Sequence, residues 1–222
     1  MLIQITVPAQ SFFVQLFHTV GEKKLQLDSG KYFNQLNQPF TINKFKYYIS
    51  NICITNSSGK IIKSDQSFLI DEEEEGSKKI ILPGVPKDNY RSIEFIVGVD
   101  SLHNCSGAQS GALDPLNGMY WAWNTGYIFL KLEGKSPQST LPAKIFEYHI
   151  GGYKFPNNCI RKIVLPLQSQ TCSTIIINVD IAKMLSIPVP VDFAKYGSIT
   201  DSKNSALIAN NYATMFSVLK QE

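Results

Sequence analysis

Alternating apolar and polar residues run through most of the chain and predict β-strands. The stretch 11–20 places five of its side chains on one face of a strand: Phe12, Val14, Leu16, His18 and Val20. The stretch 90–100 predicts a second strong strand, with three residues on one face: Ile93, Phe95 and Val97. Residues 44–62 predict two more strands around a Ser-Ser-Gly turn.

The second half of the chain continues this pattern. Strand-like segments follow at 143–153, 159–167 and 172–185, and we expect the isoleucine run 175–177 to be fully buried. Residues 101–118 are rich in turn formers, and we expect a long ordered excursion that covers one end of the fold. Helical periodicity is weak. Its best match is residues 205–219, with Asp201 or Ser202 as the N-terminal cap.

Strands separated by turns at intervals of about 8–12 residues indicate a β-sandwich or a related barrel. We therefore predict an all-β fold, a single-domain antiparallel β-sandwich over residues 1–222. It should have long loops and at most a short C-terminal helix. Neither an internal repeat nor a linker is apparent in the sequence.

Composition and charge exclude several classes of protein. Hydrophobic residues form 44% of the chain and aromatic residues 11%, which is too apolar for a disordered protein. The net charge of +3 gives no electrostatic case for nucleic-acid binding. No apolar run approaches the roughly 18 residues of a transmembrane helix. The opening lacks the pattern of a secretory signal, so the protein is cytosolic or a leader was removed.

Motifs for enzymatic catalysis are missing from the sequence, which contains no GxSxG, HExxH or phosphate-binding glycine loop. We therefore predict that the protein is not an enzyme. The four cysteines form no CxxC pair, and two disulfides or four free thiols fit equally well. The acidic run 71–75 is expected to be exposed and dispensable, because a run of like charges is usually a solvated loop.

The candidate metal ligands are few. Three histidines, His18, His103 and His149, each lie beside a different strand. Imidazole suits copper and zinc, but the spacing alone favours packed or surface histidines. Trp121 and Trp123 would project to the same face of one strand, and their pattern alone favours core packing over a binding role.

Three aspartates give a weaker set of candidates, this time for calcium. They are Asp28, Asp100 and Asp114, which could bind the ion together with nearby loop carbonyls. Their spacing does not match an EF-hand. An aspartate before proline, as at Asp114, is more typical of a turn former.

Three long stretches of the sequence resemble one family. They are GVDSLHNCSGAQSGALDPLNGMYWAWNTGYIFLKLEG, FEYHIGGYKFPNNCIRKIVL and ALIANNYATMF, and the earlier FHTVGEKKLQLDSGKYFN also fits. Together they resemble the MbnP-like family, which includes the methanobactin-associated periplasmic protein and the copper-repressible surface proteins of methane-oxidising bacteria. The form ALDPxxGMYWAW is similar to a subgroup of Bacteroidetes lipoproteins.

This resemblance implies a secreted β-rich protein, periplasmic or at the cell surface, whose mature chain begins near the present N-terminus. Some relatives bind copper through two histidines and a tryptophan oxidised to kynurenine. A dihaem enzyme of the cytochrome c peroxidase type performs that oxidation. Carried over, the copper ligands would come from five residues: His18, His103, His149, Trp121 and Trp123. The pair His103-Asn104 reverses the Asn-His order that copper-binding relatives often show.

Two functions follow as hypotheses. The first is a secreted or surface-anchored copper-binding protein that acts as a scavenger or carrier. The alternative is a non-enzymatic binding module for carbohydrate or a surface partner, with an aromatic platform of four residues: Tyr120, Trp121, Trp123 and Tyr127.

Overall fold

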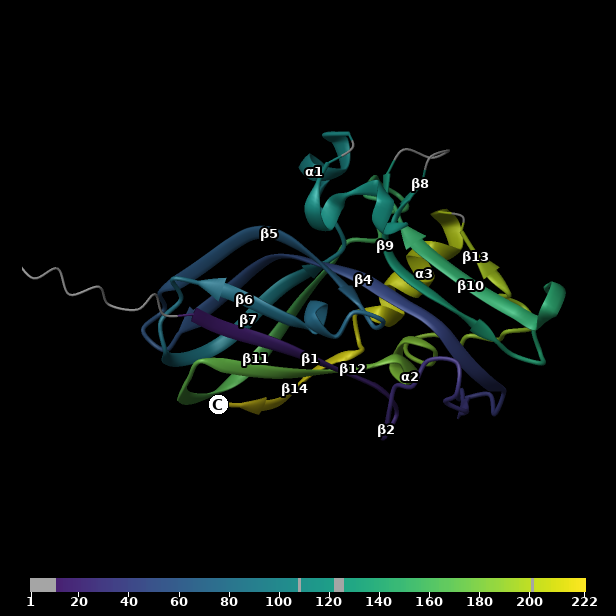
Figure 1. Cartoon of the computed structure of the whole chain (residues 1–222), viewed down its shortest axis with the longest axis horizontal. Helices are drawn as coiled ribbons and strands as arrows, with labels where there is room; N and C mark the ends of the chain where they lie inside the picture. The colour runs from purple at the N-terminus through teal and green to yellow at the C-terminus, as the bar shows by residue number, and fades with distance from the viewer. Residues whose placement is uncertain (1–10, 108, 122–125, 201) are drawn as a thin grey trace, which may run out of the picture.

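The computed structural model of the chain contains two curled β-sheets that share one hydrophobic core (Figure 1). It describes residues 11–107, 109–121, 126–200 and 202–222. Strands account for 51% of the residues and helices for 15%. The predicted all-β, sandwich-like fold is therefore confirmed.

The smaller, five-stranded sheet is built around the first strand. Strand β1 pairs in parallel with β12 and antiparallel with both β2 and β6, while β14 pairs with the far edge of β12. The bounds are β1 Ser11–Val20, β2 Lys23–Lys24, β6 Lys79–Pro83, β12 Thr174–Asp180 and β14 Phe216–Gln221. The parallel pairing of β1 with β12 departs from the antiparallel arrangement expected from the sequence.

The larger, nine-stranded sheet has the order β11–β7–β4–β9–β10–β13, with β3 and β5 also paired to β4 and β8 paired to β9. Strand β4 runs diagonally through the molecule and connects most of the sheet (Figure 1). The bounds are β3 Tyr32–Phe33, β4 Pro39–Asn56, β5 Ile61–Asp71, β7 Asp88–Val97, β8 Tyr120–Trp121, β9 Gly126–Lys135, β10 Ile145–Gly151, β11 Arg161–Cys172 and β13 Ser198–Ile199.

The core lies between the inward faces of the two sheets. The predicted faces of β1 and β7 are buried, and Phe12 of β1 meets Tyr90 edge-on with ring centroids 5.1 Å apart. Phe95 of β7 meets Phe216 of β14 in the same way, also at 5.1 Å. Ile176 is only half-buried, contrary to expectation, because alternation along β12 turns it away from the core face of Ile175 and Ile177.

Short helical segments join the strands. The α-helices are α1 Ser101–Cys105, α2 Ile181–Met184 and α3 Ser202–Tyr212, and the 3₁₀-helices are η1 Glu75–Lys78, η2 Gly111–Leu113, η3 Pro115–Asn117 and η4 Pro142–Lys144. Segments α1, η2 and η3 lie in the excursion predicted for residues 101–118. Helix α1 and strand β8 are on the same side of the molecule (Figure 1). Within the described residues, no helix has the length and apolar character needed to cross a membrane.

The predicted C-terminal helix is wrong in its second half. Helix α3 ends at Tyr212, and residues 216–221 form β14, antiparallel to β12. Met215 and Phe216 are buried at the start of this strand. Pairing with the open edge of β12 supplies backbone hydrogen bonds and burial, and these outweigh the weak helical periodicity of the segment.

Candidate functional site

The three histidines lie on three different elements, and each is hydrogen-bonded to a carboxylate. His18 lies on β1, His103 on α1 and His149 on β10. Among the residues that the structure describes, no group of three or more His, Cys, Asp or Glu side chains could hold a metal ion. Each of the three histidines has a carboxylate partner of its own.

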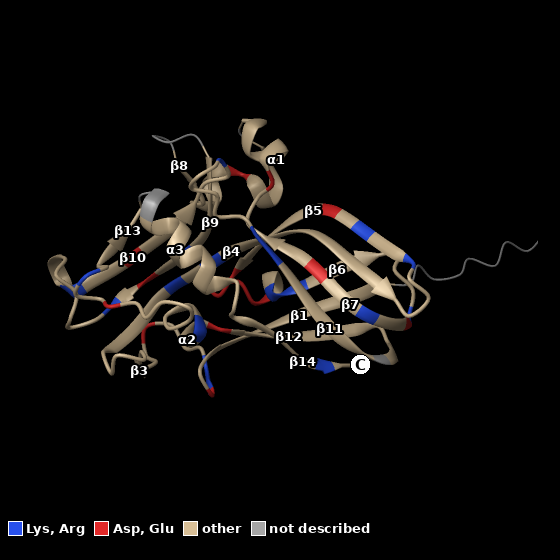
Figure 2. Ribbon diagram, turned by 180° about the vertical axis from the view of Figure 1, so that it is seen from behind, with Lys and Arg blue, Asp and Glu red and all other residues tan. Residues whose placement is uncertain are grey.

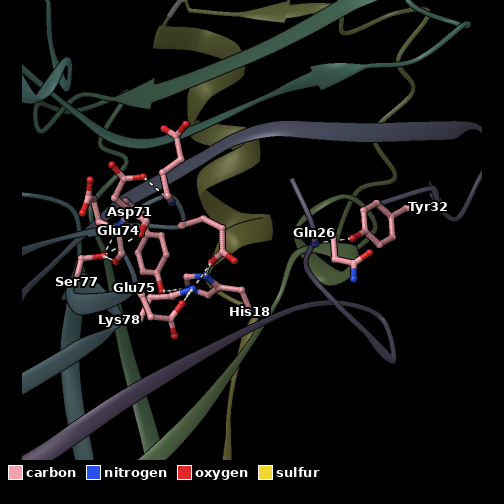
Figure 3. Close-up of polar contacts among 11 residues, drawn as sticks. His18, Gln26, Tyr32, Asp71, Glu74, Glu75, Ser77 and Lys78 are labelled. Atoms are coloured by element: carbon pink, nitrogen blue, oxygen red, sulfur yellow. Dashed lines mark hydrogen bonds and ion pairs between the residues drawn. The ribbon is translucent and has the colours of Figure 1, made fainter. Parts of the chain in front are cut away.

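His18 is buried in a polar network between the sheets (Figure 3). Its Nδ1–H donates to Glu72 Oε2 over 2.5 Å, and its Nε2 then accepts from the Tyr47 hydroxyl over 2.9 Å. Lys78 Nζ lies 3.3 Å from the same Glu72 oxygen and 2.7 Å from Glu75 Oε2. Burial lowers the pKa of His18, and the Glu72 hydrogen bond offsets only part of that effect. Both ring nitrogens of this histidine are thus occupied.

The acidic run 71–75 is not the exposed loop that the sequence predicted. Asp71 is buried, and its carboxylate lies 2.6 Å from Lys46 Nζ. The Glu72 side chain is only 9% exposed because it faces His18 and Lys78. The acids are tolerated there because each has a cationic or hydrogen-bonding partner. Only the middle and end of the run, from Glu73 onward, face solvent.

His103 is held by the residue that begins its helix. Asp100 caps α1 by accepting from the His103 backbone N–H over 3.0 Å, and its other oxygen lies 2.8 Å from His103 Nδ1. Burial alone would raise the pKa of Asp100, but the hydrogen bonds from His103 outweigh it and hold that pKa below its usual range. The bond to Nδ1 fixes the ring and leaves Nε2 as the nitrogen for a ligand.

Asn104 connects this helix to the strand that follows the tryptophans. Its buried side chain donates to the Val99 and Asp100 carbonyls and accepts from the Tyr127 backbone N–H over 3.2 Å. Tyr127 lies on β9, directly opposite Tyr120 of β8. The segment that carries His103 is therefore fixed beside the tryptophan strand, which is the neighbourhood that the sequence predicted.

His149 lies on β10 and faces the side of the sheet away from His18. Its Nε2 lies 2.8 Å from Glu133 Oε1 on β9. Glu133 is two residue pairs along the ladder from Lys131, the residue opposite His149. The hydrogen bond from His149 holds the pKa of Glu133 below its usual range, against the effect of burial. As with His103, a carboxylate fixes one ring nitrogen and leaves the other, here Nδ1, for a ligand.

Trp121 belongs to the core at the end of the nine-stranded sheet. It is 7% exposed, and it packs on Gly151 of β10 so closely that a Cβ atom there would lie 2.7 Å from Trp121 Cζ3. This contact brings the tryptophan close to the strand that carries His149. Trp123 lies outside the described residues, so its predicted role and the predicted shared face stay predictions.

Two of the four residues of the proposed aromatic platform, Trp121 and Tyr127, are internal. Tyr127 is 1% exposed, and it meets both Tyr48 and Tyr120 edge-on, at centroid distances of 5.9 and 5.1 Å. Its hydroxyl donates to the Leu113 carbonyl over 2.8 Å. Since Trp121 is buried as well, these two rings have no open face on which a sugar could stack.

The three aspartates proposed for calcium have separate structural roles. Asp28, in a left-handed conformation, accepts from the Asn43 side chain. Asp100 caps α1, and Asp114 caps η3 by accepting from the Leu116 N–H over 2.9 Å. The structure does not gather them into a cluster among the described residues, and the turn-forming role expected for Asp114 matches its position.

The four cysteines are free thiols, which is one of the two alternatives left open by the sequence. Cys159 and Cys172 are buried, and Cys53 is half-buried. Burial raises the pKa of Cys159 to about 12. Cys105 is exposed, and its Sγ lies 3.3 Å from the Tyr153 hydroxyl.

Sequence reasoning missed the partners of His18. Tyr47, Glu72 and Lys78 come from β4 and from the β5–β6 connection, far from His18 in sequence. One signal was available, because alternation places His18 on the inward face of β1 with Phe12. A histidine on such a face needs polar partners, and the acidic run offered them.

These observations define a class of protein: a two-sheet, β-rich domain with short helices and carboxylate-supported histidines. The sequence model of the MbnP family matches residues 9–206, so the chain belongs to the MbnP family. A solved structure described as MbnP from Methylosinus trichosporium superposes with a TM-score of 0.60 and covers 85% of this chain and 80% of that chain. The two sequences are 14% identical, so the superposition shows a shared fold and nothing more. No curated protein shows significant sequence similarity to the chain.

Proposed function

We propose that this protein is a periplasmic or surface-anchored copper-binding protein, a scavenger or carrier of the metal and not an enzyme. Membership of the MbnP family over residues 9–206 is the observation that carries this proposal, because the family is linked to copper. Copper is the fitting metal among those that imidazole binds, since it forms the most stable complexes with nitrogen ligands.

Two of the candidate ligands fit a metal site better than the others. In His103 and in His149, a carboxylate holds one ring nitrogen and the second nitrogen is left to coordinate, which is the usual support of a metal-binding histidine. His18 fits less well because both of its nitrogens are engaged by Glu72 and Tyr47. Oxidation of Trp123 by a partner enzyme would supply an amino and a carbonyl group as further ligands.

Copper uptake by purified protein tests the proposal. The parent protein, His103→Ala and His149→Ala are produced with and without a dihaem peroxidase-type partner, loaded with copper and analysed by elemental analysis and intact mass. We expect uptake by the parent after tryptophan oxidation, and weak or no uptake without the partner. Each histidine variant should lose uptake, whereas Gln15→Ala, an exposed position on β1, should behave as the parent does.

Asp100→Asn gives a finer test of the His103 assignment. It removes the carboxylate that orients the ring but leaves the imidazole, so copper affinity should fall by roughly 10–100-fold. Equal uptake by His103→Ala and the parent would exclude His103 as a ligand. If the parent protein takes up no copper even after co-production with the oxidase, the copper proposal is overturned.

Export is tested separately by cell fractionation of the native protein. We expect the protein in the periplasm or at the cell surface. A cytoplasmic pool without any processed form would exclude export. The copper assignment would then depend on the uptake measurements alone.

A further inference from the structure

A run of four consecutive apolar residues is exposed after helix α2. It is Ile187-Pro188-Val189-Pro190, which we call the proline loop. Ile187 is 49% exposed and Val189 is 37% exposed. Apolar residues on a protein surface are normally scattered among polar ones, so an unbroken exposed run of this kind indicates a function.

The backbone of the proline loop has its N–H groups already bonded within the protein. The two prolines lack this group. The N–H of Ile187 donates to a carbonyl of α2 over 2.9 Å, and that of Val189 donates to the Asn211 side-chain oxygen over 3.2 Å. Asn211 also donates to the Val189 carbonyl over 2.7 Å, and the Thr214 hydroxyl donates to the Ile187 carbonyl over 3.4 Å. The loop therefore presents apolar side chains over an internally bonded backbone.

A second turn lies beside the proline loop and adds two exposed apolar side chains. They are Phe33, 59% exposed at the end of β3, and Leu36, 45% exposed in the turn that follows. Asn34 joins the two loops, because its buried side chain donates to the Val191 carbonyl over 2.8 Å and accepts from the Leu36 N–H over 3.0 Å. Phe33 also lines one cavity with Ala182 of α2. Figure 2 shows β3 and α2 on the side of the molecule away from α1.

Unpaired lysines surround these apolar side chains. Residues 20–36 contain three lysines and two acids, and residues 180–196 contain two lysines and two acids. The lysines are Lys23, Lys24, Lys31, Lys183 and Lys195. Within the described residues, none of the five forms an ion pair. Three of the four acids, Asp28, Asp180 and Asp192, instead accept hydrogen bonds from neighbouring N–H groups. The ammonium groups are therefore available to an outside partner.

A lipid bilayer fits this combination of features. In hydrocarbon, backbone polar groups must be bonded internally, and the N–H groups of the proline loop meet that condition. A protein interface instead carries about one hydrogen bond per 100–200 Å², for which the loop has no free N–H to offer. Lysine side chains can lay their stems on apolar surface and place their ammonium groups among anionic headgroups.

We propose that the proline loop, with Phe33 and Leu36 beside it, inserts its apolar side chains into the surface of an anionic lipid bilayer. The surrounding lysines contact the phosphates of the headgroups. Insertion is shallow and reversible, because only a few side chains enter the boundary between headgroups and acyl chains, which is about 5–10 Å deep. The inference does not depend on copper binding.

Sedimentation of the whole chain with vesicles tests this inference, in the presence of a chelator. The vesicles contain equal parts of phosphatidylglycerol and phosphatidylcholine, and the parent protein should sediment with them. The double variant Ile187→Ser, Val189→Ser should lower the partition coefficient at least about tenfold, since each aliphatic side chain loses its transfer into an apolar phase. Added sodium chloride should weaken binding without abolishing it, because screening acts on the lysines and leaves the apolar contribution.

A matched double variant provides the control. Ile61→Ser with Val164→Ser removes the same two residue types from β5 and β11, where they are 56% and 55% exposed, and should bind vesicles as the parent does. A third variant, Val189→Trp, should gain blue-shifted emission with vesicles that brominated acyl chains quench. The inference is overturned if the parent does not bind, if both double variants bind equally weakly, or if salt abolishes binding. Emission of Val189→Trp that vesicles leave unchanged would also overturn it, since the loop then stays in water.

Discussion

Replacement of Glu72 by alanine should destabilise the protein, although the residue lies in a run of five acids. The substitution removes the acceptor for His18 Nδ1–H at 2.5 Å and one of the two carboxylates beside Lys78. It leaves a buried imidazole N–H without its partner and a buried ammonium group with only Glu75, at 2.7 Å. Both losses act in the native state and have no counterpart in the unfolded chain.

The size of the effect follows from this geometry. Removing one partner of a fully buried ion pair costs about 3–5 kcal/mol. The cost should be smaller here, because Glu75 still neutralises Lys78, and an unsatisfied buried donor costs about 1–3 kcal/mol. We therefore expect a loss of about 2–3 kcal/mol for Glu72→Ala, which lowers Tm by roughly 4–12 °C in a chain of this length.

Urea denaturation followed by fluorescence measures this loss, with Glu73→Ala as the control. Glu73 is the next residue of the run and is exposed, so its replacement removes the same charge without touching the network. Glu72→Gln should lie between the two, since its amide oxygen can still accept from His18. If Glu72→Ala and Glu73→Ala unfold at the same urea concentration, the His18–Glu72–Lys78 network does not stabilise the fold.

Three further predictions concern other parts of the molecule. Burial holds the pKa of His18 below its ordinary value of 6.5, so between these two pKa values the unfolded chain binds more protons than the native protein does. Stability should therefore fall as the pH is lowered from neutral into that window. His18→Gln should flatten this part of the stability profile measured by urea denaturation, and an unchanged profile would contradict the assignment. Gly151→Ala places a methyl group against the Tyr127 carbonyl and the Trp121 ring, so it should destabilise the protein by about 1–3 kcal/mol or more; a Tm equal to that of the parent would show that the packing is looser than described. Iodoacetamide should modify Cys105 first and Cys159 last, because the Cys105 thiol is exposed and the Cys159 thiol is buried, with its pKa raised to about 12. Peptide mapping over time measures this order, and faster modification of Cys159 than of Cys105 would refute it.

The strands could be predicted from the sequence because their alternation reflects burial on one face. The face of β1 that contains Phe12, and that of β7 that contains Phe95, are both buried as expected. The partners of these strands could not be predicted. Parallel pairing of β1 with β12 joins residues from opposite ends of the chain, and β14 forms where a helix was expected because β12 offers an open edge. Pairing of this kind depends on the whole fold, which local periodicity does not encode.

The candidate site was less accessible to sequence reasoning. The histidines could be named, and the link between the His103 segment and the tryptophan strand is present through Asn104 and Tyr127. The carboxylate beside each histidine was not predicted. Only Asp100 gave a signal in the sequence, because it lies three residues before His103, which is the spacing of a helix cap. Glu72 and Glu133 reach their histidines across strands, so their roles depend on register and topology.

The parallel pairing of β1 with β12 also determines when the protein can fold during its synthesis. Val14 lies opposite Ile175, so the central strand of the five-stranded sheet lacks one neighbour until most of the chain has left the ribosome. Contacts between residues so far apart in sequence form slowly, because a long loop must close before they contribute. Strand β1 can pair with β2 and β6 early in synthesis, but the five-stranded sheet cannot be completed until β12 and β14 have also been made.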